Sequence, residues 1–381
     1  SARSLCRMSE TTHRARKRFD NPGYMKPVGQ RMVEATANDG AKVMVDTDCV
    51  LAKELFGLKC DYRHMSPVII PRGYTTKFLR GQIDEREQIT HIRESWAALS
   101  GASDFVVVEG TGHTGVGSII NCNNARVASE LGLDMLMVVN GGLGDPFDQL
   151  ALNFLMCHKY GVRVKGIVLN KVHTEKAASG VQRELFTLAL DRMAKHYNQP
   201  EVPLLGVLAD APVLGAPNFV SFSALFETSL ICGHNHITRQ FTKPPRICLT
   251  ELGRFLELLA TGQDNDQLFI SHASREDIIL GILAHAQMCD RRAEKYGDDS
   301  LRFRGGLILT GCPKGGEPHP RILAIIEESH ADFPIIYALG STAQTVAKLG
   351  GFTSKLSIQN QDQTQAAIDV YSKIDFERLI A

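Results

Sequence analysis

One stretch of the sequence places a carboxylate and a run of glycines directly after an apolar segment. In FVVVEGTGHTGVGSIINCNN, residues 105–124, Glu109 follows four apolar residues and precedes four glycines. Glycines in such a place let backbone N–H groups crowd around an anion, whereas a carboxylate repels one. Mg²⁺ would resolve this conflict, because it binds one or two carboxylates together with phosphate oxygens. We therefore expect Glu109 to hold Mg²⁺, directly or through water, beside nucleotide phosphates near Gly110, Thr111 and Gly112.

Two other interpretations of this stretch stay open. In the first, Glu109 caps a strand and the glycines merely turn the chain. In the second, GTGHTG at 110–115 is a dinucleotide-binding G-x-G-x-x-G. Three observations count against the second: the next helical pattern starts only near Asn123, the following strand ends in the neutral Asn140 where an acid is wanted, and no cation accompanies Glu109.

A lysine and two aspartates follow other apolar segments in the amino-terminal part. Lys26 in GYMKPVGQ ends the first strand pattern, where its side chain can reach a carboxylate or phosphate in the crevice of a parallel sheet. Asp46 and Asp48 precede a helical pattern. They are either acids that favour the helix amino terminus or include a second magnesium ligand, with Asp48 the better candidate. Lys26 can equally be a solvated surface lysine.

Two further strand ends carry polar side chains and glycine. NGGLGDPFDQL at 140–150 is a turn from a strand to a helix that begins with Asn140 and Gly141. IVLNKV at 167–172 ends in Asn170 and Lys171, whose side chains can read the amide-bearing edge of a base. Taken alone, the second feature is equally a polar strand end without a ligand.

Alternating short apolar runs and helical patterns position these residues. This alternation predicts βαβ units and a doubly wound, mostly parallel sheet of the α/β class. Strands are expected at 23–28, 104–109, 134–140, 163–170 and 203–208, and helices at 47–57, 82–100, 123–132, 146–160 and 175–196.

A second βα series follows a polar, proline-containing segment at 233–245. Its strands are expected at 267–273, 305–311 and 334–339, and its helices at 276–294, 320–329, 341–349 and 362–374. We therefore predict a basic amino-terminal segment at 1–20, a first domain at 21–234 and a smaller α/β domain at 235–381.

The composition excludes several classes of protein. The formal net charge is +0, so no overall field favours nucleic acid or an anionic membrane. No apolar run approaches the roughly 20 residues of a membrane-spanning helix, which predicts a soluble protein. The nine cysteines show no C-x-x-C or zinc spacing, which favours reduced thiols in an intracellular, reducing compartment.

The first 19 residues hold six Arg or Lys and five Ser or Thr against one acid, Glu10. This bias is typical of chloroplast or mitochondrial transit peptides, and equally of a basic end without an address. In the latter case we expect a cytoplasmic protein.

The segments YMKPVGQ, VDTDCVLAKELFGL, SPVIIPRGYT, DFVVVEGTGHTGVGSIINCNNARVASELG, VVNGGLGDPFDQL and GVRVKGIVLNKV together resemble one family. It is the dethiobiotin-synthetase-like P-loop domain (AAA_26-type) found at the amino end of long phosphate acetyltransferases and in stand-alone proteins similar to cobyrinic acid a,c-diamide synthase. The resemblance runs from about residue 23 to 218. Residues 235–381 resemble the DRTGG domain that follows it in those proteins, although GSTAQT at 340–345 departs from the motif.

The resemblance implies a site for ATP and Mg²⁺, with Asp48 and Glu109 on the metal and with Lys26 and Glu109 as the catalytic residues. Asn140, Gly141, Asn170 and Lys171 would contact the nucleotide. The Walker A loop, G-x-x-x-x-G-K-[ST], should hold the phosphates, yet RMSETTHRARKRF stands in its place. The sequence therefore predicts impaired ATP binding, through either a truncated start or a non-hydrolysing domain. The resemblance does not extend to the acetyltransferase catalytic domain, so acetyl transfer is not expected.

Three functions remain. The first is a regulatory or interaction protein with an eroded nucleotide site. The second is an ATP- and Mg²⁺-dependent carbon–nitrogen ligase resembling dethiobiotin synthetase, acting on a small carboxylate. The third is a scaffold subunit. We expect a homo-oligomer or a subunit of a larger assembly, with a nucleotide or small carboxylate as ligand and no nucleic acid.

Overall fold

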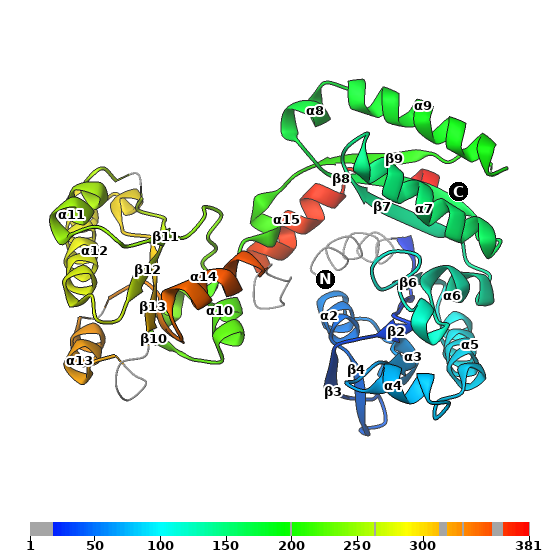
Figure 1. Cartoon of the computed structure of the whole chain (residues 1–381), viewed down its shortest axis with the longest axis horizontal. Coiled ribbons are helices and arrows are strands. Elements are labelled where there is room, and N and C mark those ends of the chain that lie inside the picture. Colours follow the sequence, from blue (N-terminus) through cyan, green and yellow to red (C-terminus); the bar gives the residue numbers. More distant parts are fainter. Residues whose placement is uncertain are drawn as a thin grey trace. The chain divides into compact units, whose positions relative to one another are not determined.

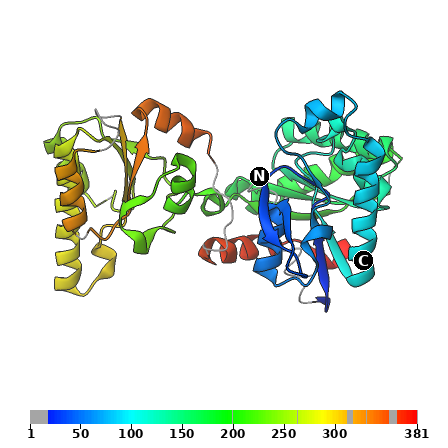
Figure 2. The same cartoon turned by 90° about the horizontal axis from the view of Figure 1, so that it is seen from below.

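The computed structural model describes residues 18–198, 200–262, 264–311, 318–329, 331–352 and 361–380. The chain forms two compact units: residues 1–211 with 356–381 make up the first, and residues 212–355 the second (Figures 1 and 2). The sequence predicts one boundary near residue 235, whereas the division lies at 211/212 and residues 356–381 belong to the first unit. The basic segment predicted at 1–20 lies outside the described residues up to position 17.

The first unit alternates strands and helices along most of its length. Its strands are β1 (Pro22–Met25), β2 (Val28–Gly29), β3 (Met32–Thr36), β4 (Lys42–Asp46), β5 (Val68–Ile69), β6 (Phe105–Val108), β7 (Met135–Asn140), β8 (Val164–Val172) and β9 (Leu204–Ala209). Its helices are α2 (Thr47–Phe56), α3 (Tyr62–Met65), α4 (Tyr74–Leu79), α5 (Glu85–Ala102), the 3₁₀ turn η1 (Ser118–Ile120), α6 (Asn124–Glu130), α7 (Asp145–Lys159), α8 (Thr174–Ala178), α9 (Val181–His196), α15 (Gln361–Tyr371) and α16 (Phe376–Ile380).

The mixed α/β architecture with parallel strands, which the alternating pattern predicts, is confirmed. β1 pairs with β6, β2 with β5, and β7, β8 and β9 form a three-stranded parallel sheet. These ladders are separate rather than one continuous doubly wound sheet. Within the described ranges β6 pairs only with β1, and β7 only with β8. The carboxyl ends of β1 and β6 nevertheless lie side by side, because Met25 pairs with Val108.

Helices cover both faces of the β7–β8–β9 sheet. On one face, α7 and α9 pack apolar side chains such as Phe154 and Phe186 against Ile167 and Leu169 of β8. On the other face, Asn170 points away from Leu169 because neighbouring residues of a strand face opposite sides. Its partner there is Tyr371 of α15. Helix α15 therefore covers this face of the sheet in the first unit.

Two local features of the first unit were not predicted from the sequence. The helix expected at 175–196 is broken into α8 and α9 at Gly180, whose φ of +73° belongs to the left-handed region where glycine is favoured. Residues 32–46 form an antiparallel hairpin of β3 and β4, in which Met32 pairs with Asp46. This hairpin carries Asp46 to the start of α2.

The second unit is a three-layer α/β structure. Its parallel strands β11 (Arg246–Ile247), β12 (Leu268–His272), β13 (Gly306–Gly311) and β14 (Ile335–Leu339) lie in spatial order after the antiparallel edge strand β10 (Leu230–Cys232), as β10-β14-β13-β12-β11. Its helices are η2 (Pro212–Gly215), α10 (Phe219–Phe226), η3 (His234–His236), α11 (Leu252–Ala260), α12 (Glu276–Tyr296), η4 (Asp299–Leu301), α13 (Pro320–Glu328) and α14 (Thr342–Gly350).

Alternate residues of these strands face two different cores. Phe269 and Leu307 face α11, α12 and α13, whereas Ile270 and Ile308 face α10 and α14. The three phenylalanines of α10 are buried in the second core. This packing explains why residues 212–234 belong to the second unit rather than to the first.

The composition predicted reduced cysteines and no membrane-spanning helix, and the described residues can be compared with both expectations. Every cysteine in the described part of the chain carries a free thiol. No helix in that part is both long enough and apolar enough to span a membrane.

Candidate functional site

Lys26 and the two aspartates meet in the interior of the first unit. Lys26 follows β1 and is only 5% exposed. Its ammonium forms an ion pair with the carboxylate of Asp48 and lies 3.2 Å from Asp46 Oδ1. Both aspartates are buried as well. The open alternative of a solvated surface lysine is therefore wrong for Lys26, because the ammonium is enclosed among carboxylates.

Asp46 has a structural role besides this ion pair. It is the N-cap of α2, where its Oδ1 accepts a hydrogen bond of 3.0 Å from the backbone N–H of Asp48. Its Oδ2 accepts from the N–H groups of Gln30 and Arg31 at 2.8 and 3.1 Å. Although burial opposes ionisation, Lys26 and these N–H groups hold the pKa of Asp46 below its ordinary value. Asp46 thus fixes the start of the helix that presents Asp48.

Glu109 lies beside this ion-pair cluster at the end of β6. Its backbone N–H donates to Met25 O at 2.7 Å, which ties the ends of β1 and β6 together. Its Oε2 accepts a hydrogen bond from the hydroxyl of Tyr24. Its Oε1 is buried without a hydrogen-bond partner. Burial raises the pKa of Glu109 to about 7, against the opposing effect of Lys26.

Tyr24 is a member of the site that the sequence analysis missed. The pKa of its hydroxyl is raised above its ordinary value, first by burial and then by Glu109. A signal for it was present: Tyr24 and Lys26 are two positions apart at the end of a strand, so their side chains share one face. We refer below to Tyr24, Lys26, Asp46, Asp48 and Glu109 as the charged cluster.

The charged cluster has more negative than positive groups. One ammonium is surrounded by three carboxylates, and all four charged side chains are nearly excluded from solvent. Burial lowers the pKa of Lys26, but the three carboxylates raise it more, so its pKa lies above the ordinary value. The lysine therefore stays charged and is already paired within the protein.

The glycine-rich loop after Glu109 is held by protein groups. Thr111 donates its hydroxyl to Val28 O at 2.7 Å, and its N–H donates to Asn124 Oδ1 at 3.1 Å. Asn124 Nδ2 donates to Thr111 O and to His113 O. Gly110 packs so closely on Asn124 that a Cβ would lie 2.9 Å from its side chain. Asn124, the first residue of α6, thus organises the loop, and no sequence signal singled it out.

The geometry of this loop also argues against the dinucleotide interpretation. After Gly115 the chain continues into the 3₁₀ turn η1, and α6 begins only at Asn124. A dinucleotide-binding loop needs a helix that opens directly on its third glycine. His113 accepts a hydrogen bond of 3.2 Å from the N–H of Gly115, which is the contact expected of a histidine in a turn.

The other predicted nucleotide contacts form a second group at the ends of β7 and β8. Asn140 pairs with Asn170 across the ladder, and the N–H of Gly141 donates to Asn170 O at 2.7 Å. Asn170 Nδ2 lies 3.4 Å from the hydroxyl of Tyr371. Lys171 is exposed and has a φ of +57°, in the left-handed region. Asn140 is exposed and Asn170 is buried beneath α15, so of the two only Asn140 faces solvent.

The fit of the charged cluster to Mg²⁺ depends on Glu109 and Asp48. Glu109 Oε1 is a buried acceptor without a hydrogen bond, as a group that meets a cation or its water would be. The carboxylate of Asp48 already forms an ion pair with the ammonium of Lys26. Within the described residues no group of three or more His, Cys, Asp or Glu side chains is arranged to hold a metal. One carboxylate with a second nearby suffices for Mg²⁺, which keeps several waters.

The first unit is thus a mixed α/β domain with parallel strands and polar groups at their carboxyl ends, an arrangement consistent with a P-loop-like domain. The model of the AAA domain family AAA_26 matches residues 13–218. This family includes dethiobiotin-synthetase-like P-loop domains, and the match covers more than half of the chain. The chain belongs to this family. No curated protein matches the chain. Because the family match ends at residue 218, the resemblance of residues 235–381 to a DRTGG domain stays a prediction.

Proposed function

We propose that the protein is a regulatory or interaction protein in which a P-loop NTPase-like domain binds ATP poorly. The observation that supports this proposal is the pairing of Lys26 with Asp48 and Asp46. A lysine that serves a phosphate must offer its ammonium to the ligand. In this protein the ammonium is already neutralised by two carboxylates of the same chain.

The charge of the cluster works against an incoming nucleotide. Three carboxylates outnumber one ammonium, so the cluster attracts cations rather than phosphate. Each missing charge-assisted hydrogen bond to phosphate costs about 1.5–3 kcal/mol, or roughly a ten- to hundredfold loss of affinity.

The burial of the cluster favours a regulatory or interaction role over a scaffold. A buried ion pair is often no more stable than an apolar replacement of similar size. A domain kept for packing alone would therefore gain nothing from enclosing Lys26 with three acids. Glu109 Oε1, buried without a partner, has an energetic cost that a ligand could remove. Residues 235–381, which resemble a DRTGG domain, would act as the sensing or dimerising module.

Calorimetry tests this proposal directly. The full chain is titrated with ATP in the presence of excess Mg²⁺, and with Mg²⁺ alone as the control. We expect no ATP binding in the micromolar range, and the same result for Lys26→Met. Micromolar affinity for ATP·Mg²⁺ in the wild-type chain would overturn the proposal.

The second candidate function is an ATP- and Mg²⁺-dependent ligase resembling dethiobiotin synthetase or cobyrinic acid a,c-diamide synthase. It is favoured by the free oxygen of Glu109. Glu109 and Asp48 would hold Mg²⁺, which supplies neutralisation of phosphate charge when bound. Lys26 would then leave Asp48 to stabilise the transferring phosphoryl group, while Gly110, Thr111 and Gly112 lie along the phosphates. Asn140, Gly141, Asn170 and Lys171 would lie toward the base.

In such a reaction the γ-phosphoryl group of ATP passes to a substrate carboxylate or carbamate, which releases ADP. An amine then attacks the phosphorylated carbon and displaces phosphate. ADP release by the purified chain is measured with diamines, dicarboxylates and corrin acids. The ligase requires ADP release that depends on the second substrate and is lost in Glu109→Gln. If the wild-type chain releases no ADP with any of them, the ligase is excluded and the regulatory function stands.

A further inference from the structure

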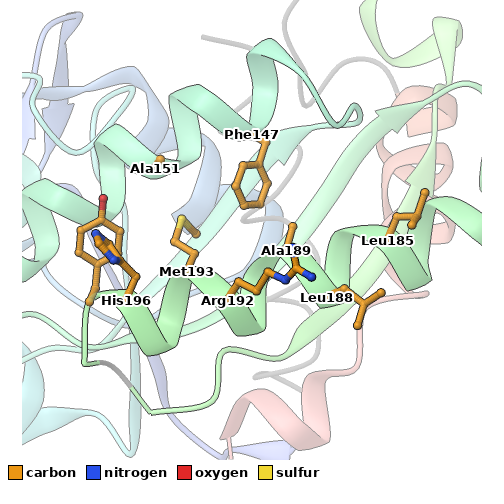
Figure 3. A pocket seen from close by; sticks show the side chains of 9 residues that line it. Phe147, Ala151, Leu185, Leu188, Ala189, Arg192, Met193 and His196 are labelled. Atoms are coloured by element: carbon orange, nitrogen blue, oxygen red, sulfur yellow. The ribbon is translucent and has the colours of Figure 1, made fainter.

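A pocket of about 510 Å³ lies between helices α7 and α9 of the first unit (Figure 3). Phe147 and Ala151 line it from α7, and Leu185, Leu188 and Ala189 line it from α9. Ligand-binding pockets typically measure about 300–1,000 Å³ and are lined mostly by apolar side chains, with a few polar groups that orient the ligand. The size and the lining of this pocket therefore agree with a site for a small, largely apolar molecule.

The α9 side of the pocket carries apolar residues that the core does not use. Leu185 is 44% accessible and Leu188 is 52% accessible. Other residues of the same helix, such as Phe186 and Leu190, fill the core against the β7–β8–β9 sheet. Outside its core-facing stripe, a surface helix normally presents charged or polar residues. The two exposed leucines therefore favour a ligand that covers this side of α9.

One cation, Arg192, lies within this apolar side of α9. On a helical wheel Arg192 is about 20° from Leu185 and about 40° from Leu188, between the two. Its side chain is exposed, and within the described part of the chain it takes part in no ion pair. Side chains of a helix lean toward its amino terminus, so the guanidinium reaches back toward Leu188 and Ala189. Figure 3 shows the Arg192 side chain extending in this direction along the pocket.

The charge of the pocket indicates what the ligand carries. The residues that line the pocket include no aspartate or glutamate to neutralise Arg192. Their other polar side chains are His196 and Tyr197, at the carboxyl-terminal end of α9, whose ring centroids are 5.0 Å apart. A planar guanidinium matches a carboxylate, which it binds through two parallel hydrogen bonds. The pocket is therefore complementary to a carboxylate that carries an apolar chain.

We propose that the pocket between α7 and α9 binds a fatty-acid anion, with the carboxylate on Arg192 and the hydrocarbon chain between the two helices. The chain packs against Phe147 of α7 on one side and Leu185 of α9 on the other. From Leu185 to His196 the pocket follows α9 over about 16 Å, which suits an extended chain. No residue of the charged cluster lines the pocket, so this inference does not depend on the proposed function.

Calorimetry of the full chain with three probes tests the class of ligand. Decanoate carries both the charge and the chain, decanol lacks the charge, and butanoate lacks most of the chain. We expect one decanoate to bind per chain, about ten- to hundredfold more tightly than decanol, because the alcohol loses the charge-assisted contact with Arg192. Butanoate should bind at least tenfold more weakly than decanoate, because it buries much less apolar surface.

Two pairs of variants test the location of the site. Arg192→Gln should weaken the binding of decanoate at least tenfold and leave that of decanol unchanged. Arg183→Gln is its matched control, because Arg183 is exposed on α9 and does not line the pocket. Leu188→Gln should weaken the binding of decanoate about tenfold, since it removes apolar contact with the chain. Leu79→Gln is the control for it, because Leu79 is an exposed leucine on α4 of the same unit, 66% accessible.

Three results would overturn the proposal: no saturable binding of decanoate, equal affinities for decanoate and decanol, or the same affinity for decanoate in Arg192→Gln as in Arg183→Gln. Sedimentation of the chain with anionic phosphatidylglycerol vesicles, without binding of free decanoate, would also overturn it, because a membrane surface would then cover the pocket. Dimers that are lost in Leu188→Gln, again without binding of decanoate, would overturn it in favour of a second copy of the chain.

Discussion

Replacing Lys26 by methionine removes the one cation of the charged cluster while keeping most of the side-chain volume. The change leaves Asp46, Asp48 and Glu109 buried without their counter-ion. Removal of one partner from a buried ion pair typically destabilises a protein by about 3–5 kcal/mol, because the remaining charge has lost both water and its partner. We expect Lys26→Met to lower the free energy of unfolding by about that amount at pH 8.

The expected pH dependence follows from the carboxylates that remain. Without Lys26, the pKa of Glu109 rises further above its value in the unfolded chain, because burial still raises it and the opposing effect of the ammonium is gone. The folded state then binds protons more tightly than the unfolded state, so stability increases as the pH falls. The loss in Lys26→Met should therefore shrink between pH 8 and pH 5.

Urea unfolding followed by the fluorescence of Trp96 provides the assay. Trp96 is the single tryptophan of the chain and lies on α5 of the first unit, so it reports on the unit that contains the cluster. Lys42→Met is the matched control. Lys42 is exposed and pairs with Glu34 at 3.3 Å, and an exposed pair is worth about 0–1 kcal/mol. A loss for Lys26→Met no larger than that for Lys42→Met, or a loss that does not change with pH, would refute the reasoning.

Three further changes probe the site and its supports. The pKa of about 7 for Glu109 means that wild-type stability falls as the pH rises from about 4.5 to 7. Glu109→Gln should remove this slope and be more stable than the wild type at pH 8, by at most about 3 kcal/mol in urea unfolding. Asn124→Ala should speed amide hydrogen exchange throughout the glycine-rich loop, whereas unchanged exchange would show that Asn124 does not hold it. Gly141→Ala places a Cβ 2.4 Å from Val172 and should cost about 1–3 kcal/mol, while Gly144→Ala, with open space around it, should unfold as the wild type does.

The periodic pattern predicted most elements of the regular structure because it reports burial along a strand or a helix. The strands expected at 104–109 and 134–140 agree with β6 and β7 within one residue at each end. The hairpin at 32–46 was missed because its two strands are only five residues long each and are mostly exposed or half-buried, so no buried apolar run marks them. The break at Gly180 was missed because the apolar spacing continues through it.

The location of the candidate site at the ends of strands was predicted for the same reason. Lys26 and Glu109 follow apolar strands, and parallel strands end at the same edge of a sheet. That Lys26 and Glu109 lie close together at one edge of a sheet therefore follows from the order of strands and polar residues. The state of each side chain did not follow from that order. The sequence left open whether Lys26 faced solvent and whether Asp46 capped a helix or held a metal. It also assigned residues 361–380 to the second domain, whereas they belong to the first unit.

The amino-acid sequence by itself determined the α/β class, the positions of most strands and the presence of acids and a lysine at strand ends. Only the tertiary structure decided that Lys26 is neutralised by Asp48, that Tyr24 donates to Glu109 and that Tyr371 reaches Asn170. The physical reason is distance along the chain. Periodicity records which face of an element is buried, but the choice between partners 22, 85 or 201 positions apart depends on packing in three dimensions.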